Sequence, residues 1–192
     1  MLDTLVNWDI DCFRWINSHY CTAMDWTMWT LSQHWCWAVV LVLFFALVTL
    51  RKEPHRWWLI IGAAVLCFLL ADQGSVHLFK DTVCRLRPCH ALDDVRMFHT
   101  RCGGQYGFVS SHAANAFAIA MFLFLRYRHK APWGVAMIFL WAFATSYSRI
   151  YLGKHYPGDT LCGAMFGMLC GWAVWMLSAW IEKKKCIKSE TK

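Results

Sequence analysis

The sequence predicts an all-α fold, a polytopic membrane bundle of five to six transmembrane helices with an amphipathic helix at its N-terminus. The first reason is composition: 58% of the 192 residues are hydrophobic and only 16% are charged, whereas soluble domains have roughly 45–50% apolar residues. The second reason is that the apolar residues gather in five stretches, each close to the ~20 residues that a spanning helix needs. A large soluble helical bundle is the alternative, but it would have too few polar residues to cover its surface. We see no repeat or linker and expect residues 1–192 to form a single integral-membrane domain.

The N-terminal helix is predicted over residues 1–20, where apolar residues recur at near-helical spacing among acidic ones. Such a segment is too polar to span and is typical of a helix that lies on a membrane or caps a bundle. Asp3, Asp9 and Asp11 stand where a cleavable signal peptide carries basic residues. We therefore do not expect this segment to be a signal peptide.

The five predicted spans follow along the chain, and tryptophan and tyrosine gather at their ends as interfacial anchors do. They cover roughly residues 35–50, 57–79, 113–125, 132–147 and 160–181, and residues 22–34 are expected to complete the first. Successive connections between these spans then lie on opposite sides of the membrane.

The formal net charge is +7, and the basic residues concentrate in the connections 51–56 and 126–130 and in the tail 183–192. In a five-span path these three segments lie on one side, and short loops rich in Lys and Arg mark the cytoplasmic side. The loop 80–109 and the turn 150–158 are then expected on the extracytoplasmic side. Basic residues placed beside apolar segments indicate contact with the bilayer and no nucleic-acid partner.

Three of the ten cysteines, Cys84, Cys89 and Cys102, lie in the loop expected to face outward, where oxidising conditions allow two of them to pair. A Cys89–Cys102 disulfide would close this loop. The chain has no Cys-x-x-Cys unit, so we expect no metal site. The cysteines in the predicted spans are interpreted as small apolar residues: Cys36, Cys67, Cys162 and Cys170.

The run from Ser148 to Asp159 carries the strongest indication of chemistry. It places a cation, Arg149, an imidazole, His155, and a carboxylate, Asp159, between two apolar stretches. These are the groups needed to bind a phosphate and attack it with an oriented imidazole. Asp159 also suits the first turn of a helix that begins near Pro157, where the helix dipole favours an acid. The structural and functional interpretations of Asp159 are compatible.

Two further fragments lie on the same predicted side of the membrane. Lys80 and Arg87 supply cations suited to phosphate oxygens, although snorkelling interfacial cations are the structural alternative. Ser110, Ser111 and His112 precede the third span, where free backbone N–H groups favour an anion. Ser110 is expected to cap the helix and Ser111 to donate to a phosphate oxygen, and a plain cap beside an interfacial histidine is the alternative.

An acid inside a predicted span, Asp72, is expected to be functional or paired. Asp72, Val76 and Lys80 share one helix face, so we predict that Asp72 supports Lys80. The sequence does not indicate a direct catalytic role for it.

These fragments resemble the three-part signature of the type 2 phosphatidic acid phosphatase superfamily, which also contains vanadium haloperoxidases. The resemblance rests on Lys80-x6-Arg87-Pro88, on Ser110-Ser111-His112 and on Ser148-Arg149-x5-His155-x3-Asp159. The second fragment departs from the family pattern Pro-Ser-Gly-His, because Val109 and Ser111 replace the proline and the glycine.

The resemblance implies a metal-independent, two-step hydrolysis that uses no cofactor. His155 would attack phosphorus to form a phosphohistidine, with Asp159 orienting it. His112 would protonate the leaving alkoxide and then activate water. The phosphate would be held by Lys80, Arg87, Ser110, Ser111 and Arg149, with Asp72 and Ser148 in support.

A site at the membrane surface favours a lipid phosphate as substrate. The loop residues His90, Arg96, His99 and Arg101 favour a large anionic headgroup, either lipid A or undecaprenyl pyrophosphate. Phosphatidylglycerophosphate and phosphatidate are alternative substrates. A vanadate-dependent haloperoxidase, a phosphatidyl transferase and a non-catalytic membrane protein are the rival functions. Nothing in the sequence predicts an oligomeric state.

Overall fold

The computed structural model describes residues 2–190, with side chains described for residues 3–184. The tail lysines Lys185, Lys188 and Lys192, predicted to lie at the membrane surface, fall outside the described side chains. Regular structure in the described chain is helical, apart from one isolated bridge between Leu86 and Tyr106. The elements are α1 (Leu2–Ser18), α2 (Thr22–Leu31), α3 (His34–Phe44), the π-helical turn η1 (Phe45–Thr49), α4 (Leu50–Lys52), α5 (Trp57–Gly74), the π-helical turn η2 (Ser75–Lys80), α6 (Asp81–Val83), α7 (Pro88–Ala91), α8 (Ser111–Tyr127), α9 (Pro132–Tyr151) and α10 (Pro157–Glu190).

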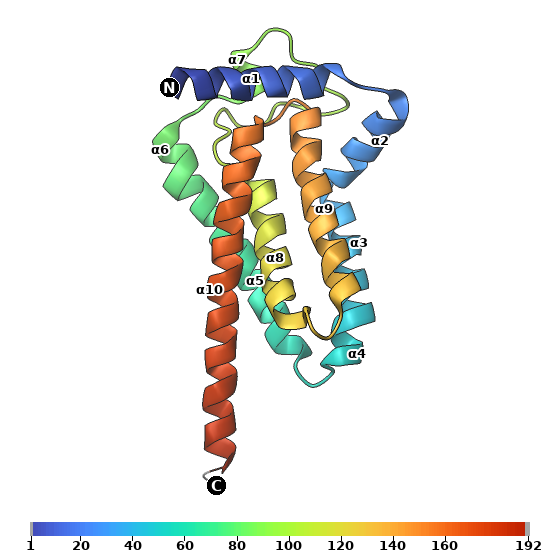
Figure 1. The fold of residues 1–192 in the computed structure, drawn as a ribbon, viewed down its shortest axis with the longest axis vertical. Helices are drawn as coiled ribbons and strands as arrows, with labels where there is room; N and C mark the ends of the chain where they lie inside the picture. Colours follow the sequence, from blue (N-terminus) through green and yellow to red (C-terminus); the bar gives the residue numbers. More distant parts are fainter. Residues whose placement is uncertain (1, 191–192) are drawn as a thin grey trace.

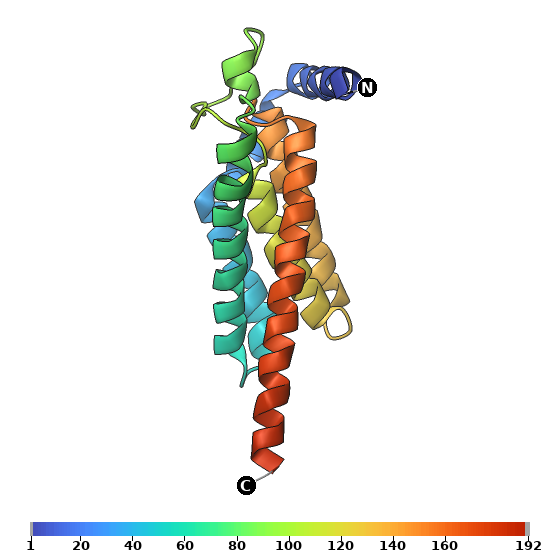
Figure 2. The same ribbon diagram turned by 90° about the vertical axis from the view of Figure 1, so that its left-hand side faces the viewer.

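The predicted membrane bundle is confirmed. Among the described residues, three continuous helical segments are long and apolar enough to cross a membrane: His34–Lys52, Trp57–Val83 and Pro157–Lys184. The other two apolar stretches form α8 and α9, of 17 and 20 residues, which run beside these three in the bundle (Figures 1 and 2). Residues 22–34 do not extend the first span as expected, because Ser32 ends α2 and the extended backbone of Gln33 separates it from α3.

Helix α8 is the centre of the bundle, and its close packing against α10 depends on small residues. Gly163, Gly167 and Gly171 face the backbone of α8 at one-turn intervals. A Cβ added at Gly167 would lie only 2.1 Å from the carbonyl oxygen of Ala114. Small residues let two backbones approach in this way where lipid supplies no hydrophobic drive between helices.

The two ends of the bundle differ in character, as the charge pattern predicted. The connections α4–α5 and α8–α9 lie at one end, towards which α10 also runs, while the loop 84–110 and the α9–α10 turn lie at the other (Figures 1 and 2). At the basic end the buried carboxylate of Glu53 pairs with Arg126 and Lys130, and Arg126 also pairs with Glu182 at 2.8 Å. These ion pairs tie the connections to α10.

Helix α1 lies across the opposite end, roughly perpendicular to the bundle (Figure 1). Its buried face carries Phe13 and Ile16, whereas Trp8 and Trp15 are exposed. Phe13 packs edge-on against Tyr156, with 5.5 Å between ring centroids. The predicted amphipathic N-terminal helix is therefore confirmed, and it caps the bundle beside the α9–α10 turn.

Candidate active site

His155 lies in the short turn between α9 and α10. The turn closes because the carbonyl oxygen of Arg149 accepts hydrogen bonds from the backbone N–H groups of Lys154 and His155, at 3.0 and 3.2 Å. Gly153 has a φ of +76°, a left-handed conformation that glycine adopts without strain. Pro157 then starts α10 as expected, since its missing N–H has no partner to lose there. The result is a fixed imidazole, only 1% exposed, at the end of the bundle.

Asp159 lies in the first turn of α10, directly behind His155. Its Oδ2 atom is 3.5 Å from Nδ1 of His155 and accepts the backbone N–H of Tyr156 at 3.0 Å. Its Oδ1 atom accepts a hydrogen bond from Nη1 of Arg85 at 2.9 Å. The carboxylate is fully buried, so these partners fix its orientation towards the imidazole.

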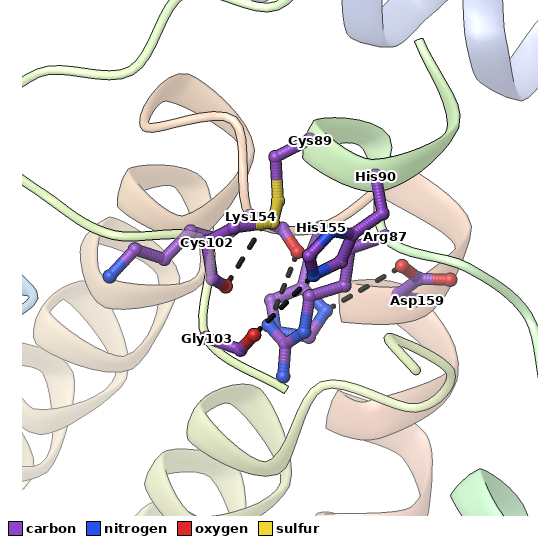
Figure 3. Close-up of a disulfide and its surroundings, with 8 residues drawn as sticks. All are labelled: Arg87, Cys89, His90, Cys102, Gly103, Lys154, His155 and Asp159. Atoms are coloured by element: carbon purple, nitrogen blue, oxygen red, sulfur yellow. Dashed lines mark hydrogen bonds and ion pairs between the residues drawn. A yellow bond between two sulfur atoms is a disulfide. The ribbon is translucent and has the colours of Figure 1, made fainter. Parts of the chain in front are cut away.

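Arg87 determines which nitrogen of His155 carries the proton. Its Nη1 atom donates to Nε2 of His155 at 2.9 Å and to the carbonyl oxygen of Lys154 at 3.3 Å (Figure 3). A guanidinium only donates hydrogen bonds, so Nε2 accepts and the proton of the neutral ring sits on Nδ1, facing Asp159. Burial, followed by the positive charges of Arg87, Arg149 and Lys80, lowers the pKa of His155 well below its usual value of 6.5.

Lys80 reaches the site from the end of η2. Its Nζ atom donates to Oγ of Ser111 at 2.6 Å, and Oγ of Ser75 lies 2.6 Å from the same oxygen. This chain of contacts joins the span that ends at Val83 to the N-terminus of α8. It holds an ammonium group beside the first backbone N–H groups of α8, where an anion is favoured.

These groups surround a cavity of about 280 Å³. Arg87 and Arg149 line it, and the Nε atom of each is buried without a hydrogen-bond partner. Buried donors without partners are costly, and an anion with several oxygens would satisfy them. The lining residues are His34, Trp37, Phe68, Asp72, Val76, Lys80, Arg87, Ser111, His112, Asn115, Arg149 and His155.

The structure brings most of the predicted site residues to this cavity, but not all of them. Ser110 is buried outside it, and its Oγ makes no hydrogen bond, so the expected side-chain cap of α8 is wrong. Ser110 instead donates its backbone N–H to the carbonyl oxygen of Asp159 at 3.0 Å. Ser148 lies within α9, where its Oγ donates to the carbonyl oxygen of Thr145 at 2.6 Å.

Asp72 lines the cavity on the same face as Lys80, as the helical spacing predicted. Its carboxylate, however, accepts hydrogen bonds from Nδ2 of Asn115 at 3.1 Å and from Nε2 of Gln73 at 3.3 Å. The ammonium of Lys80 turns to Ser111 instead. Asp72 therefore joins α5 to α8 rather than pairing directly with the lysine.

Sequence reasoning missed several residues at the site. His34 and Trp37 line the cavity from α3, and their rings lie 5.7 and 5.8 Å from that of His112. Neither residue stands near a recognised motif, so only the packing of α3 against α8 shows their place. Arg85 contacts Asp159, and Asp9 contacts Arg85 in turn. From the sequence, Arg85 is only an interfacial cation and Asp9 only a polar residue of the N-terminal helix.

The loop that contains Arg87 is closed by a disulfide between Cys89 and Cys102, with 5.9 Å between their Cα atoms (Figure 3). The structure thus shows which two of the three loop cysteines pair, a point that the sequence left open. These thiols and His90 form the one potential metal-binding group among the described residues, and the disulfide removes both thiolates from it.

Arg96 and His99, which the sequence suggested as headgroup contacts, have partners on α2. The guanidinium of Arg96 forms a bidentate pair with Asp25 of α2, at 2.8 and 2.7 Å. The imidazole of His99 stacks on Trp26, with 5.3 Å between ring centroids. Both loop residues therefore anchor the loop to α2.

The chain is similar to several known proteins. Residues 57–183 match the PAP2 superfamily. The chain is 40% identical over 122 residues to a lipid A 4'-phosphatase of Bacteroides thetaiotaomicron, covering 62% of this chain and 53% of the relative. It is 30% identical over 155 residues to a lipid A 4'-phosphatase of Porphyromonas gingivalis, covering 77% of this chain and 63% of the relative. The chain thus spans between half and two thirds of the length of these relatives.

The fold is also similar to a solved structure. The crystal structure of Aquifex aeolicus LpxE superposes with a TM-score of 0.63 and 25% sequence identity, covering 86% of this chain and 93% of that one. The family match extends from α5 through most of α10 and includes the cavity residues from Lys80 to His155. Since that match covers more than half of the chain, the protein belongs to the PAP2 superfamily.

Proposed function

We propose that this protein is a membrane phosphatase that removes phosphate from a lipid through a phosphohistidine intermediate. The observation that carries the proposal is the contact between Nη1 of Arg87 and Nε2 of His155 at 2.9 Å. It identifies Nε2 as the nitrogen that bears the lone pair of the neutral ring, in a cavity that also holds Lys80 and Arg149. Phosphoryl transfer needs a positioned nucleophile and cations around the phosphate, and this cavity provides both.

In the first step Nε2 of His155 attacks phosphorus, and the bond between phosphorus and the lipid oxygen breaks. Burial and the nearby positive charges lower the pKa of His112 below its usual value in the free protein. The negative charge of a bound lipid phosphate raises that pKa, so His112 takes up a proton and donates it to the leaving alkoxide, and the lipid departs as an alcohol. Asp159 stabilises the positive charge that develops on the imidazole through the proton on Nδ1. Lys80, Arg87 and Arg149 offset the charge of the phosphoryl oxygens.

In the second step water attacks phosphorus, and His112, now neutral, accepts a proton from that water. The bond from phosphorus to Nε2 breaks, and its electron pair returns to His155. Inorganic phosphate leaves, with His112 again protonated. The two steps use the cavity side chains, Asp159 behind His155, and water.

A second cavity supports a lipid as the substrate. It has a volume of about 520 Å³ and lies among α3, η1, α5 and α8, with an almost entirely apolar lining. His34, Trp37 and Phe68 line both cavities, so the apolar one adjoins the cationic one. A molecule with an acyl chain and a phosphate fits this pair of cavities, because the acyl chain meets the apolar lining and the phosphate meets the cationic one.

Among lipids we favour lipid A as the substrate, because two relatives with 40% and 30% identity are named lipid A 4'-phosphatases. Undecaprenyl pyrophosphate is the second candidate, since the 280 Å³ cavity has several cations for a longer phosphate chain. We place the cavity on the periplasmic side of the inner membrane, because the basic connections lie at the opposite end of the bundle. Residues 1–192 would then act as one membrane domain.

The test is phosphate release by the purified protein with EDTA present, from lipid A, undecaprenyl pyrophosphate, phosphatidylglycerophosphate and phosphatidate. We expect release from the wild type, loss of release in His155→Ala, and an acid-labile phosphoprotein when the second step is slowed. His77→Ala is the matched control, because His77 is an exposed histidine. The proposal fails if no lipid phosphate is hydrolysed, or if His155→Ala releases phosphate at the wild-type rate. Halide oxidation that depends on vanadate would instead identify a haloperoxidase.

The lipid requirement has a separate test. Ala64→Trp fills the apolar cavity, whereas Leu69→Trp places the same ring at an exposed position of α5. We expect Ala64→Trp to raise KM for a long-chain lipid phosphate while hydrolysis of p-nitrophenyl phosphate stays unchanged. Leu69→Trp should leave both reactions unchanged.

A further inference from the structure

The N-terminal helix contributes a charged group to the network behind His155. Oδ2 of Asp9, in α1, lies 2.7 Å from Nη2 of Arg85. Nη1 of the same guanidinium is 2.9 Å from Oδ1 of Asp159. Asp159 in turn faces Nδ1 of His155. One arginine therefore bridges two carboxylates, one from α1 and one from α10.

The geometry of this bridge is fixed on all sides. Oδ1 of Asp9 accepts the backbone N–H of Gly158 at 2.7 Å, at the N-terminus of α10. The guanidinium carbon of Arg85 lies 4.0 Å from the centroid of the Tyr156 ring. Arg85 and Asp9 are about a quarter exposed or less, with side-chain exposures of 24% and 14%. Charge pairs with this little exposure are screened much less by salt than pairs on an open surface.

Asp9 changes the net charge of the group that lies behind the His155 imidazole. Arg85 alone would neutralise Asp159 and weaken its attraction for the proton on Nδ1 of His155. With Asp9 present, the three groups carry one net negative charge behind the imidazole. That charge favours the imidazolium that forms as Nε2 attacks phosphorus.

We propose that Asp9 and Arg85 are positioning residues for the reaction of His155, and that α1 therefore belongs to the active site. Arg85 holds the carboxylate of Asp159 in place, and Asp9 keeps that carboxylate effective by sharing the charge of Arg85. Asp9 lies outside residues 57–183, the part of the chain that matches the PAP2 superfamily. This inference rests on the proposed function of His155.

The test uses Asp9→Asn and Arg85→Gln, which remove one charge each and keep a polar side chain. Asp11→Asn is the matched control, because Asp11 is an exposed acid on the same helix. The first readout is the NMR titration of the His155 ring, which needs no substrate. Arg85→Gln should raise the His155 titration midpoint and Asp9→Asn should lower it, each by about half a unit to one unit. Asp11→Asn should leave the midpoint unchanged.

The other groups that face His155 are unchanged in these variants, so opposite shifts can arise only from the bridge. They are Lys80 from η2, Arg87 from the loop before α7, His112 from α8, Arg149 from α9 and Asp159 from α10. A purely structural role for Asp9 and Arg85 would move both midpoints in one direction or leave both unchanged. Either result overturns the inference.

The second readout is kinetic. Both variants should lower kcat about tenfold or more while KM changes less than about threefold, because the contacts that bind substrate remain intact. Opposite NMR shifts without hydrolysis by the wild type would retain the bridge and refute the proposed function. Wild-type hydrolysis together with unchanged kcat in both variants would retain the function and refute the inference.

Discussion

Gly167→Ala is expected to lower phosphate release although Gly167 does not line the cavity. The added methyl group would push α8 and α10 apart, and each of these helices carries residues of the site. A Cβ at this position would lie 2.1 Å from the carbonyl oxygen of Ala114 and 2.8 Å from its carbonyl carbon. Ordinary van der Waals contact begins near 3.4 Å, so α8 and α10 must move apart locally by about 1.3 Å, the difference between 3.4 and 2.1 Å. Both clashing atoms are backbone, so no side-chain rotation relieves the overlap.

The same two helices carry His112 at the start of α8 and Asp159 in the first turn of α10. A misplacement of about 1 Å between catalytic groups lowers a rate by roughly 100-fold. Overpacking of a well-packed contact also lowers the free energy of unfolding by about 1–3 kcal/mol. We therefore expect kcat for phosphate release to fall about 100-fold while the protein remains folded in detergent.

The matched control is Gly62→Ala in α5. Gly62 is also a glycine inside an apolar helix, but a Cβ there has no atom within 4 Å. It shares with Gly167→Ala the change in helix propensity and lacks the clash. Activity and thermal unfolding should be measured for both variants in the same detergent. Wild-type activity in Gly167→Ala would refute the claim that moving α8 away from α10 lowers kcat. Equal losses of activity in both variants would show that the change in helix propensity, and not the clash, is the cause.

Three further results are expected. Replacing Cys89 and Cys102 together by alanine should lower the free energy of unfolding by about 3 kcal/mol, because the disulfide closes a loop of similar size to one of 15 residues; unchanged denaturant unfolding would contradict this. Arg87→Gln should raise the pKa of His155, which the wild type holds below 6.5, so an NMR titration should show less neutral imidazole at pH 6; an unmoved midpoint would count against the Arg87 contact. Glu53→Gln should destabilise the fold by about 3–5 kcal/mol, since it leaves two basic partners without their buried carboxylate, while activity per folded molecule at the other end of the bundle stays unchanged; a selective loss of activity would show coupling between the ends.

The end of the bundle at which the site forms was predictable, because spans alternate in direction. Lys80, His112 and His155 each follow or precede a span at the same end, so counting spans brings them together without any knowledge of packing. The α9–α10 turn was also predictable, since Pro157 suits only the first position of a helix. Local spacing thus accounts for the motif residues and their common end.

The contacts between helices were not predictable from local spacing. Arg85 and Asp9 meet only because α1 crosses the end of the bundle at one particular angle. Asp72 accepts a hydrogen bond from Asn115, since the partner of an acid inside a span depends on which helix packs against it. The break between α2 and α3 at Gln33 was not predictable either, because no proline or glycine marks it in the sequence.

One contact between helices does have a signal in the sequence. Gly163, Gly167 and Gly171 recur every four residues, which is typical of a close helix contact in membranes. Ala114 and Ala118 show the same spacing on the partner helix. Together these small residues indicate the α8–α10 contact that sets the distance between the halves of the site.

The hydrogen bond from Arg87 to Nε2 of His155 means that the lone pair of the proposed nucleophile is already engaged. In the proposed reaction a phosphate must draw that N–H away before Nε2 has a free lone pair. Substrate binding and activation of the nucleophile are then one event rather than two. Between turnovers the imidazole is masked from other electrophiles, and only an anion able to compete for the guanidinium unmasks it.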